Sequence, residues 1–193
     1  MSDAHRRRKL PAEVRAQVLD VAAALCVERG LSAMTLEAVA RRAGVSKGGL
    51  LHHFPSKQAL LEGLSDELLA DFDRRIDAFA AEDPEPRGRF ARAYLLASVA
   101  FEGEPCGWNG LAALMMGDAS LRVRWTDWME ARLARPDAAE ATAELAIVRF
   151  AADGLWLSDL MGASAALRPR RAALIDALLA LTRVEGAGQD AGS

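Results

Sequence analysis

The chain has 193 residues, of which 51% are hydrophobic, and a net charge of -3 at pH 7. This size allows one or two domains with a substantial core, and no apolar run approaches the roughly 18 residues that a membrane span requires. Cys26 and Cys106 lie far apart in apolar surroundings, which argues against a disulfide framework or a zinc site and predicts free thiols in a reducing cytoplasm.

Charge is divided unevenly along the chain. Residues 1–57 hold ten Lys or Arg and five Asp or Glu, which gives +5, whereas the remaining residues carry -8. This contrast is typical of a basic nucleic-acid-binding part joined to an acidic body. The basic cluster at 5–9 is followed by no apolar segment, so it is not interpreted as a signal peptide. It is either an arm that lies on DNA or a solvated tail.

The first expected helix begins at Pro11, which suits a first helical turn, and ends at Gly30. Its apolar positions form one buried stripe, made of Val14, Val18, Val21, Ala22 and Leu25.

Two short helices joined by a tight turn are expected next. Thr35 is a good N-cap for the first, and Gly44 ends it because glycine tolerates the positive φ that follows a last turn. Ser46 caps the second helix, and Pro55 ends it. This order is the helix-turn-helix plan. The buried positions of the first helix follow helical spacing, at Leu36, Val39, Ala40 and Ala43.

The exposed side of the second helix is suited to a DNA major groove. It offers Lys47, the pair Gly48 and Gly49, and two histidines, His52 and His53. Glycine is a poor helix former, but it lets another surface come very close to the backbone. The alternative is an ordinary helical hairpin with solvated charges. Basic side chains on either side are expected to neutralise phosphates, namely Arg41, Arg42 and Lys57.

The segment AVARRAGVSKGGLLHHFPSKQALL resembles the DNA-binding motif of the TetR family of bacterial transcriptional regulators, whose pattern is roughly AVA..AGVS.G.LYHHF.SKE.LL. The match extends over about residues 18–64. Leu51 stands where the family usually has a phosphate-contacting tyrosine, and Gln58 replaces the usual glutamate. The resemblance implies DNA-binding residues Thr35, Arg42, Ser46, Lys47, Gly48, Gly49, His52, His53 and Lys57.

Only helices are expected in the rest of the chain. A long helix over 56–81 is followed by helices at about 88–101, 108–117, 119–134, 138–162 and 169–184. No strand pattern appears, so the predicted fold is all-α with about nine helices. The predicted domains are a three-helix DNA-binding head at 1–57, a ligand-binding and dimerisation body at 58–185, and a disordered tail at 186–193.

All four tryptophans lie in the acidic body, among methionines and leucines. Met and Trp suit a chamber for a small apolar or aromatic ligand, and the resemblance places the family's effector pocket here. The alternative is that these residues are ordinary core. Asp153 and Asp159 either offer charge to a cationic ligand or face solvent. The predicted ligand contacts are Trp108, Leu111, Met115, Trp125, Trp128, Met129 and Trp156.

The helices at 138–162 and 169–184 carry more apolar surface than one buried face needs. In the TetR family the corresponding helices form a four-helix bundle with a second copy, so a homodimer is expected. Folding as a monomer is the alternative. A dimer would place two recognition helices about 34–36 Å apart, matching successive major grooves of a near-palindromic operator.

Other functional classes are less consistent with the sequence. Residues 44–48 match G-x-S-x-G, but a nucleophile elbow needs a preceding strand, and a helix is expected there. Adjacent histidines point about 100° apart on a helix and have no nearby Cys or acidic cluster, so no metal site is expected. No cofactor motif is found, and an enzyme is not predicted. We therefore expect a cytoplasmic, ligand-responsive repressor, with a non-specific architectural DNA-binding protein as the rival.

Overall fold

The computed structural model describes residues 11–100, 118–135, 142–160 and 164–183. Within these ranges the secondary structure consists of eight α-helices and one short 3₁₀ helix, with no strand. The prediction of an all-α fold is confirmed. The helix expected at 108–117, the basic cluster at 5–9 and the tail at 186–193 lie outside the described residues. No helix in the described ranges is long and apolar enough to cross a membrane.

The packing divides the chain into two compact units, which we describe separately. The described part of the first unit is 11–68 and 118–124, and that of the second is 69–100, 125–135, 142–160 and 164–183. The long helix α4 (Lys57–Glu82) contributes its first twelve residues to the first unit and the rest to the second. The domain boundary predicted at residue 57 stays a prediction.

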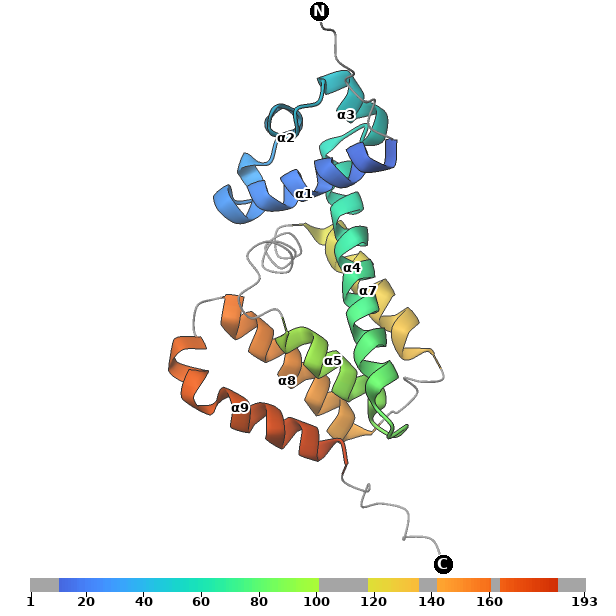
Figure 1. Cartoon of the computed structure of the whole chain (residues 1–193), viewed down its shortest axis with the longest axis vertical. Helices are drawn as coiled ribbons and strands as arrows, with labels where there is room; N and C mark the ends of the chain where they lie inside the picture. Colours follow the sequence, from blue (N-terminus) through green and yellow to red (C-terminus); the bar gives the residue numbers. More distant parts are fainter. Residues whose placement is uncertain (1–10, 101–117, 136–141, 161–163, 184–193) are drawn as a thin grey trace, which may run out of the picture. The chain divides into compact units, whose positions relative to one another are not determined.

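The first unit contains α1 (Pro11–Arg29), the 3₁₀ helix η1 (Leu31–Ala33), α2 (Leu36–Ala43) and α3 (Lys47–His53). α1 packs on η1 and on α2, and α2 packs on α3 (Figure 1). The core of the unit comes from the apolar stripes of these helices. Its fully buried or nearly buried members include Val18, Ala22, Leu25, Val39, Ala40, Leu50 and Phe54.

Local capping determines where the two short helices begin and end. The Thr35 hydroxyl accepts a hydrogen bond from the Ala38 N–H at 3.1 Å, and the Ser46 hydroxyl accepts one from the Gly49 N–H at 3.0 Å. Gly44 has a φ of 65° in the left-handed region, and its N–H donates to the Ala40 and Arg41 carbonyls. Both N-caps and the glycine stop predicted for this motif are therefore confirmed.

The start of α4 packs closely on the end of the helix-turn-helix. Ser56 caps α4 by accepting from the Ala59 N–H at 3.0 Å. A Cβ on Gly63 would lie 2.7 Å from Cε1 of Phe54, whose ring is 3% exposed. A side chain at position 63 would collide with this buried ring, so a glycine near the start of α4 permits the close approach.

The second unit contains α5 (Arg89–Val99), α8 (Ala143–Leu160) and α9 (Ser164–Leu181), together with parts of α4 and of α7 (Ala119–Leu133). α5 packs on α8 and α8 packs on α9, as Figure 1 shows. The core is mainly apolar, and a few polar or charged side chains, including Arg92 and Arg132, are buried beside it. Its most buried members include Phe72, Ile76, Tyr94, Leu95, Val148 and Ala152.

The last helix begins earlier than the sequence indicated. α9 begins at Ser164, whereas a start near 169 was predicted, and Pro169 lies inside it. Proline lacks the N–H that a helix interior needs and is more common in a first turn, so a proline at position 169 gave no signal of a helix that begins five residues earlier. The helix accommodates Pro169 with the loss of one backbone hydrogen bond, so the expectation for its start was wrong.

Candidate nucleic-acid interface and effector region

The outer side of α3 is open to solvent. Lys47, Gly48, Gly49 and His52 are exposed and His53 is half-buried, whereas Leu50 lies in the core. The separation follows from helical geometry, since the buried Leu50 and Phe54 are four residues apart and share one side. The predicted groove-facing residues therefore lie together on one short, capped helix. Their contact with DNA stays a prediction.

The two glycines of α3 differ in their surroundings. A Cβ on Gly49 would lie 3.1 Å from the Ser46 hydroxyl, so the N-cap explains a glycine there. A Cβ on Gly48 would meet nothing within 4 Å. Packing within the described chain therefore gives no reason for glycine at position 48. The absence of a side chain there leaves the backbone of α3 accessible to another molecule.

The histidines of α3 contact each other only edge to face, with ring centroids 5.6 Å apart and planes at 69°. Within the described residues no group of three or more His, Cys, Asp or Glu is arranged to hold a metal ion.

Two cations of the first unit are held by glutamates. The Lys47 ammonium donates to Oε1 of Glu37 at 2.6 Å. Both guanidinium ends of Arg42 donate to Glu28, at 2.5 and 2.6 Å. The hydrogen bond from each cation lowers the pKa of its glutamate, so both carboxylates are ionised at neutral pH. The sequence did not indicate these pairs, because each joins two different helices.

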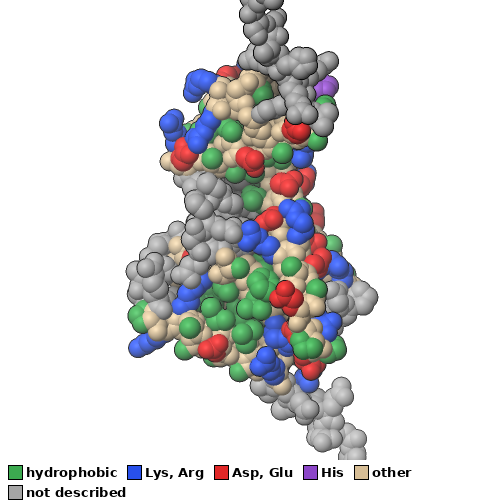
Figure 2. Space-filling model, viewed as in Figure 1, with side chains coloured by type: hydrophobic (Ala, Val, Ile, Leu, Met, Phe, Trp, Pro, Cys, Tyr) green, Lys and Arg blue, Asp and Glu red, His purple; other side chains and the backbone are tan. Residues whose placement is uncertain are grey.

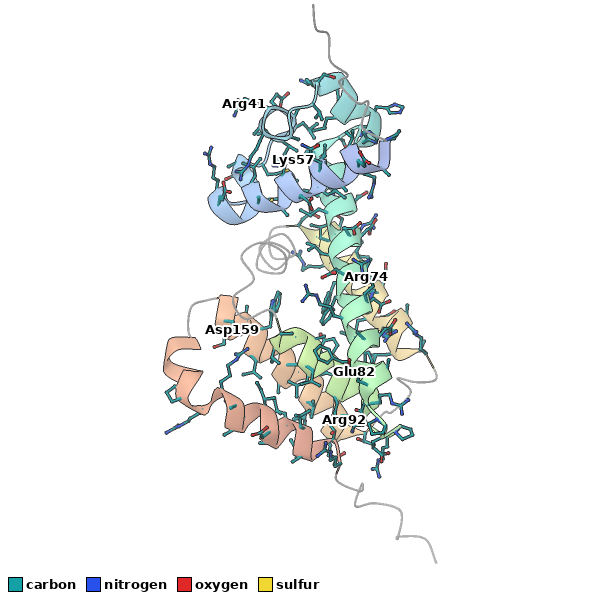
Figure 3. All side chains as sticks on the ribbon, viewed as in Figure 1. Arg41, Lys57, Arg74, Glu82, Arg92 and Asp159 are labelled. Atoms are coloured by element: carbon teal, nitrogen blue, oxygen red, sulfur yellow. The ribbon has the colours of Figure 1, made fainter. Side chains whose placement is uncertain are left out.

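Lys57 lies where α4 begins, and its ammonium donates to the Leu31 carbonyl at 3.1 Å. The side chain is half-buried and joins α4 to η1. Nearby, Cys26 is a buried free thiol whose pKa burial raises to about 11, partly opposed by the charge of Lys57. The free thiol expected at Cys26 is confirmed, and Cys106 lies outside the described residues. Figure 3 labels Lys57 and Arg41 among the side chains of this unit.

Three aromatic residues of the second unit form a cluster, in which the rings of Phe72 and Trp125 are stacked and the other two pairs are tilted. Trp125 and Trp128 have ring centroids 5.2 Å apart, and Phe72 lies 6.3 Å from Trp125 and 5.5 Å from Trp128. Both tryptophans, Met129 and Trp156 are half-buried. Of the residues predicted to contact ligand, these four are described, and Trp108, Leu111 and Met115 lie outside the described residues. Ligand contact stays a prediction for all seven.

The two aspartates of α8 are both engaged. Asp153 accepts a hydrogen bond of 2.5 Å from the hydroxyl of Tyr94, the only tyrosine of the chain. Burial raises the pKa of Asp153, opposed by the Tyr94 hydrogen bond and by Arg149. Asp159 forms an ion pair with Arg171 at 2.8 Å. In the sequence, the only sign of the hydrogen bond between Tyr94 and Asp153 was a tyrosine within the apolar run of α5.

Two helices of the second unit present apolar faces to solvent. On α8, Ile147 is 54% exposed and Phe150 is 75% exposed, and on α9 Leu174 and Leu181 are 39% and 37% exposed. Hydrophobic side chains gather on the visible face of this unit in Figure 2, where Figure 1 draws α8. The exposed residues recur at three- and four-residue steps, so each helix has one continuous apolar stripe. The α8 stripe also includes Ala143 and Gly154, and the α9 stripe Ala177.

Two family models match the chain. One, described as "Bacterial regulatory proteins, tetR family", covers residues 18–64. The other, described as "Tetracyclin repressor-like, C-terminal domain", covers residues 88–183.

Two transcriptional repressors are among the relatives. The HTH-type transcriptional repressor KstR of Rhodococcus jostii (strain RHA1) is 33% identical over 159 residues, covering 77% of this chain and 72% of that protein. The HTH-type transcriptional repressor KstR2 of Mycobacterium tuberculosis (strain ATCC 25618 / H37Rv) is 37% identical over 84 residues. The chain matches 42% of the length of this KstR2.

Solved structures share the fold over nearly the whole chain. One, described as "Molecular basis for control of antibiotic production by a bacterial hormones", has a TM-score of 0.64 and is 24% identical, covering 92% of this chain and 100% of that one. The multidrug binding protein EbrR complexed with imidazole has a TM-score of 0.59 and is 20% identical, covering 90% and 97%. These likenesses are of fold.

Proposed function

Because the chain belongs to the TetR family of bacterial regulatory proteins, we propose that it is a sequence-specific DNA-binding repressor released from its operator by a small molecule. The observation that carries the proposal is the capped helix-turn-helix, in which α3 turns Lys47, Gly48 and His52 outward on a rigid support. The sequence similarity to the repressor KstR supports the same assignment. We place the protein in the cytoplasm, where its DNA is.

In the proposed complex α3 enters the major groove. Lys47 and the two histidines contact the edges of the bases. The ammonium of Lys47 is a donor that matches the acceptors O6 and N7 of guanine. Gly48 and Gly49 let the α3 backbone approach the DNA. Phosphates are held by the remaining predicted contacts, Thr35, Arg42, Ser46 and Lys57.

The proposed active form is a homodimer joined through α8 and α9. Exposing Phe150 at 75% and Ile147 at 54% costs free energy in water, and a second copy offers a matching surface. In a two-fold dimer the same surface of each copy faces its equivalent, so the apolar stripes of α8 and α9 on one copy can be covered by the same stripes on the other. The dimer presents two α3 helices to half-sites about one turn of DNA apart.

The proposed effector is a small apolar or aromatic molecule bound in the second unit, with Trp125, Trp128, Met129 and Trp156 among its contacts. Ligand binding shifts the dimer toward a state whose two α3 helices do not fit the operator. Helix α4 carries the change, because it contributes residues to both units. A coupling of about 1–3 kcal/mol weakens operator binding about 5- to 150-fold.

Selection of bound duplexes from a random DNA pool by the purified protein, at physiological salt, tests the proposal. Enrichment of a near-palindromic consensus is expected. Binding without any enriched sequence would instead indicate a non-specific DNA-binding protein, and no binding at all would contradict the proposed function. Selection with Lys47→Ala in parallel shows whether the enriched positions depend on α3.

A further inference from the structure

The ion pair between Lys47 and Glu37 joins the proposed recognition helix to α2. The ammonium of Lys47 and the carboxylate of Glu37 are 2.6 Å apart, and their side chains are 60% and 61% exposed. DNA that reaches Lys47 therefore also reaches Glu37. We propose that Glu37 is a specificity-determining residue, which acts by holding Lys47 and by opposing DNA phosphates. This inference rests on the proposed function.

The chemistry of the pair allows Lys47 to keep its glutamate while it reads a base. An ammonium has three N–H donors, and the bond to Glu37 uses one of them. The others are free to donate to guanine O6 and N7 in the major groove. Glutamate itself accepts from the amino group of cytosine, so the carboxylate is tolerated at a suitable base pair.

Away from the operator the same carboxylate is unfavourable. Non-specific binding consists almost entirely of contacts between cations and phosphates. In such a complex Lys47 either breaks its ion pair with Glu37 to reach a phosphate, or keeps the pair and brings the Glu37 carboxylate close to a phosphate of like charge. Both alternatives cost free energy. Exposed ion pairs are weak, equivalent to a factor of about 1.4 to 5 in an equilibrium constant, so Glu37 penalises this binding without preventing it.

The second pair, between Arg42 and Glu28, provides an internal comparison. It is a bidentate pair between α2 and α1, with side chains 41% and 45% exposed. Arg42 is proposed to contact only phosphate, which is present at every DNA sequence. Removing the charge of Glu28 therefore strengthens binding to every DNA sequence equally. Removing the charge of Glu37 strengthens binding to unrelated DNA more than binding to the operator.

The test compares Glu37→Gln, Glu28→Gln and Asp20→Asn. Asp20 is an exposed carboxylate of α1, and its variant controls for the change in net charge. Affinities are measured by fluorescence anisotropy for the selected consensus duplex and for an unrelated duplex of equal length. We expect Glu37→Gln to bind the unrelated duplex about two- to fivefold more tightly than wild type, with a smaller gain on the consensus. The ratio of the two affinities therefore falls.

Salt dependence is the second readout. To the extent that Lys47 keeps its carboxylate in the wild-type non-specific complex, removing Glu37 lets it neutralise one more phosphate, so the slope of log K against log salt on the unrelated duplex becomes steeper by up to about 0.9. Glu28→Gln should show a similar slope change with an unchanged affinity ratio. Circular dichroism verifies folding, because Glu37 lies in the first turn of α2. Glu37→Asp retains the charge and should keep the ratio close to that of wild type.

Each outcome is decisive. If Glu37→Gln keeps the wild-type affinity ratio, or behaves like Asp20→Asn, the inference about Glu37 is wrong while the proposed function stands. If the wild-type protein binds neither duplex, the proposed function fails and the inference fails with it.

Discussion

Replacing Gly48 by alanine should change stability and DNA binding in opposite directions. Nothing lies within 4 Å of a Cβ at this position, so the free protein accepts the methyl group without a clash. Alanine is the better helix former, by up to about 1 kcal/mol in a helix interior. The variant should therefore be as stable as wild type or more stable, by no more than this amount.

The same methyl group should weaken operator binding, because in the proposed complex DNA lies against the backbone of α3 at Gly48. Overpacking of a close contact costs about 1–3 kcal/mol, which corresponds to about a 5- to 150-fold loss of affinity. Urea unfolding measures the first effect, and fluorescence anisotropy on the selected consensus duplex measures the second.

Gly63→Ala is the matched control for this prediction. Its Cβ would lie 2.7 Å from the buried Phe54 ring, so overpacking of about 1–3 kcal/mol outweighs or cancels the gain of about 1 kcal/mol in helix propensity. This variant should lose stability or stay neutral, and its folded fraction should bind DNA normally. If Gly48→Ala binds the operator as tightly as wild type, close approach of DNA to α3 is refuted.

The roles of Lys47, Phe150 and Asp153 can each be tested by one substitution. Lys47→Ala should weaken operator binding by about 1–3 kcal/mol in anisotropy titrations. Its melting temperature should stay that of wild type, because the ion pair of Lys47 is exposed. Loss of folding in this variant would mean that Lys47 is structural. Phe150→Ala should raise the dimer dissociation constant in sedimentation experiments. Complete burial of a phenylalanine side chain contributes about 1.5–3 kcal/mol, and Phe150 is 75% exposed in the monomer, so the variant loses about three quarters of this contribution on each protomer. Val123→Ala, a similarly exposed position, should leave the constant unchanged. Burial raises the pKa of Asp153. As pH rises above about 3.9, the pKa of an aspartate in the unfolded chain, the wild-type protein should therefore lose stability relative to Asp153→Asn. A stability difference in urea unfolding that stays constant or changes in the opposite direction would contradict this.

The sign of the last prediction follows from proton binding. A carboxyl group whose pKa is higher in the folded state holds its proton more tightly there than in the unfolded chain. Its stabilising contribution is therefore present at low pH. It is lost as pH rises through the interval between the unfolded and folded values. The amide that replaces the carboxyl group in Asp153→Asn retains an oxygen that can accept from Tyr94, so the comparison isolates the charge.

Local features of the head could be predicted because they depend on neighbouring residues. The caps at Thr35 and Ser46 and the stop at Gly44 each involve backbone groups within four residues. Such short-range rules hold in most structural contexts. The helix-turn-helix was therefore predictable from the sequence alone, before any packing was known.

Contacts between helices could not be predicted in the same way. Tyr94 and Asp153 are 59 residues apart, and their hydrogen bond depends on how α5 packs on α8. Lys47 and Glu37 lie on different helices, so helical spacing rules do not relate them. The early start of α9 was missed for a different reason, because its first turn precedes Pro169 and proline is disfavoured inside a helix.

The spacing of the two half-sites tests the central claim most directly, because a dimer holds its two α3 helices at a fixed separation. Affinity is measured for the selected consensus duplex and for the same duplex with five base pairs inserted between its half-sites, about half a turn of DNA. We expect the insertion to reduce binding to the level of an unrelated duplex, because it moves one half-site to the opposite face of the DNA helix. Equal affinity for both duplexes would contradict a dimer that reads two grooves at once.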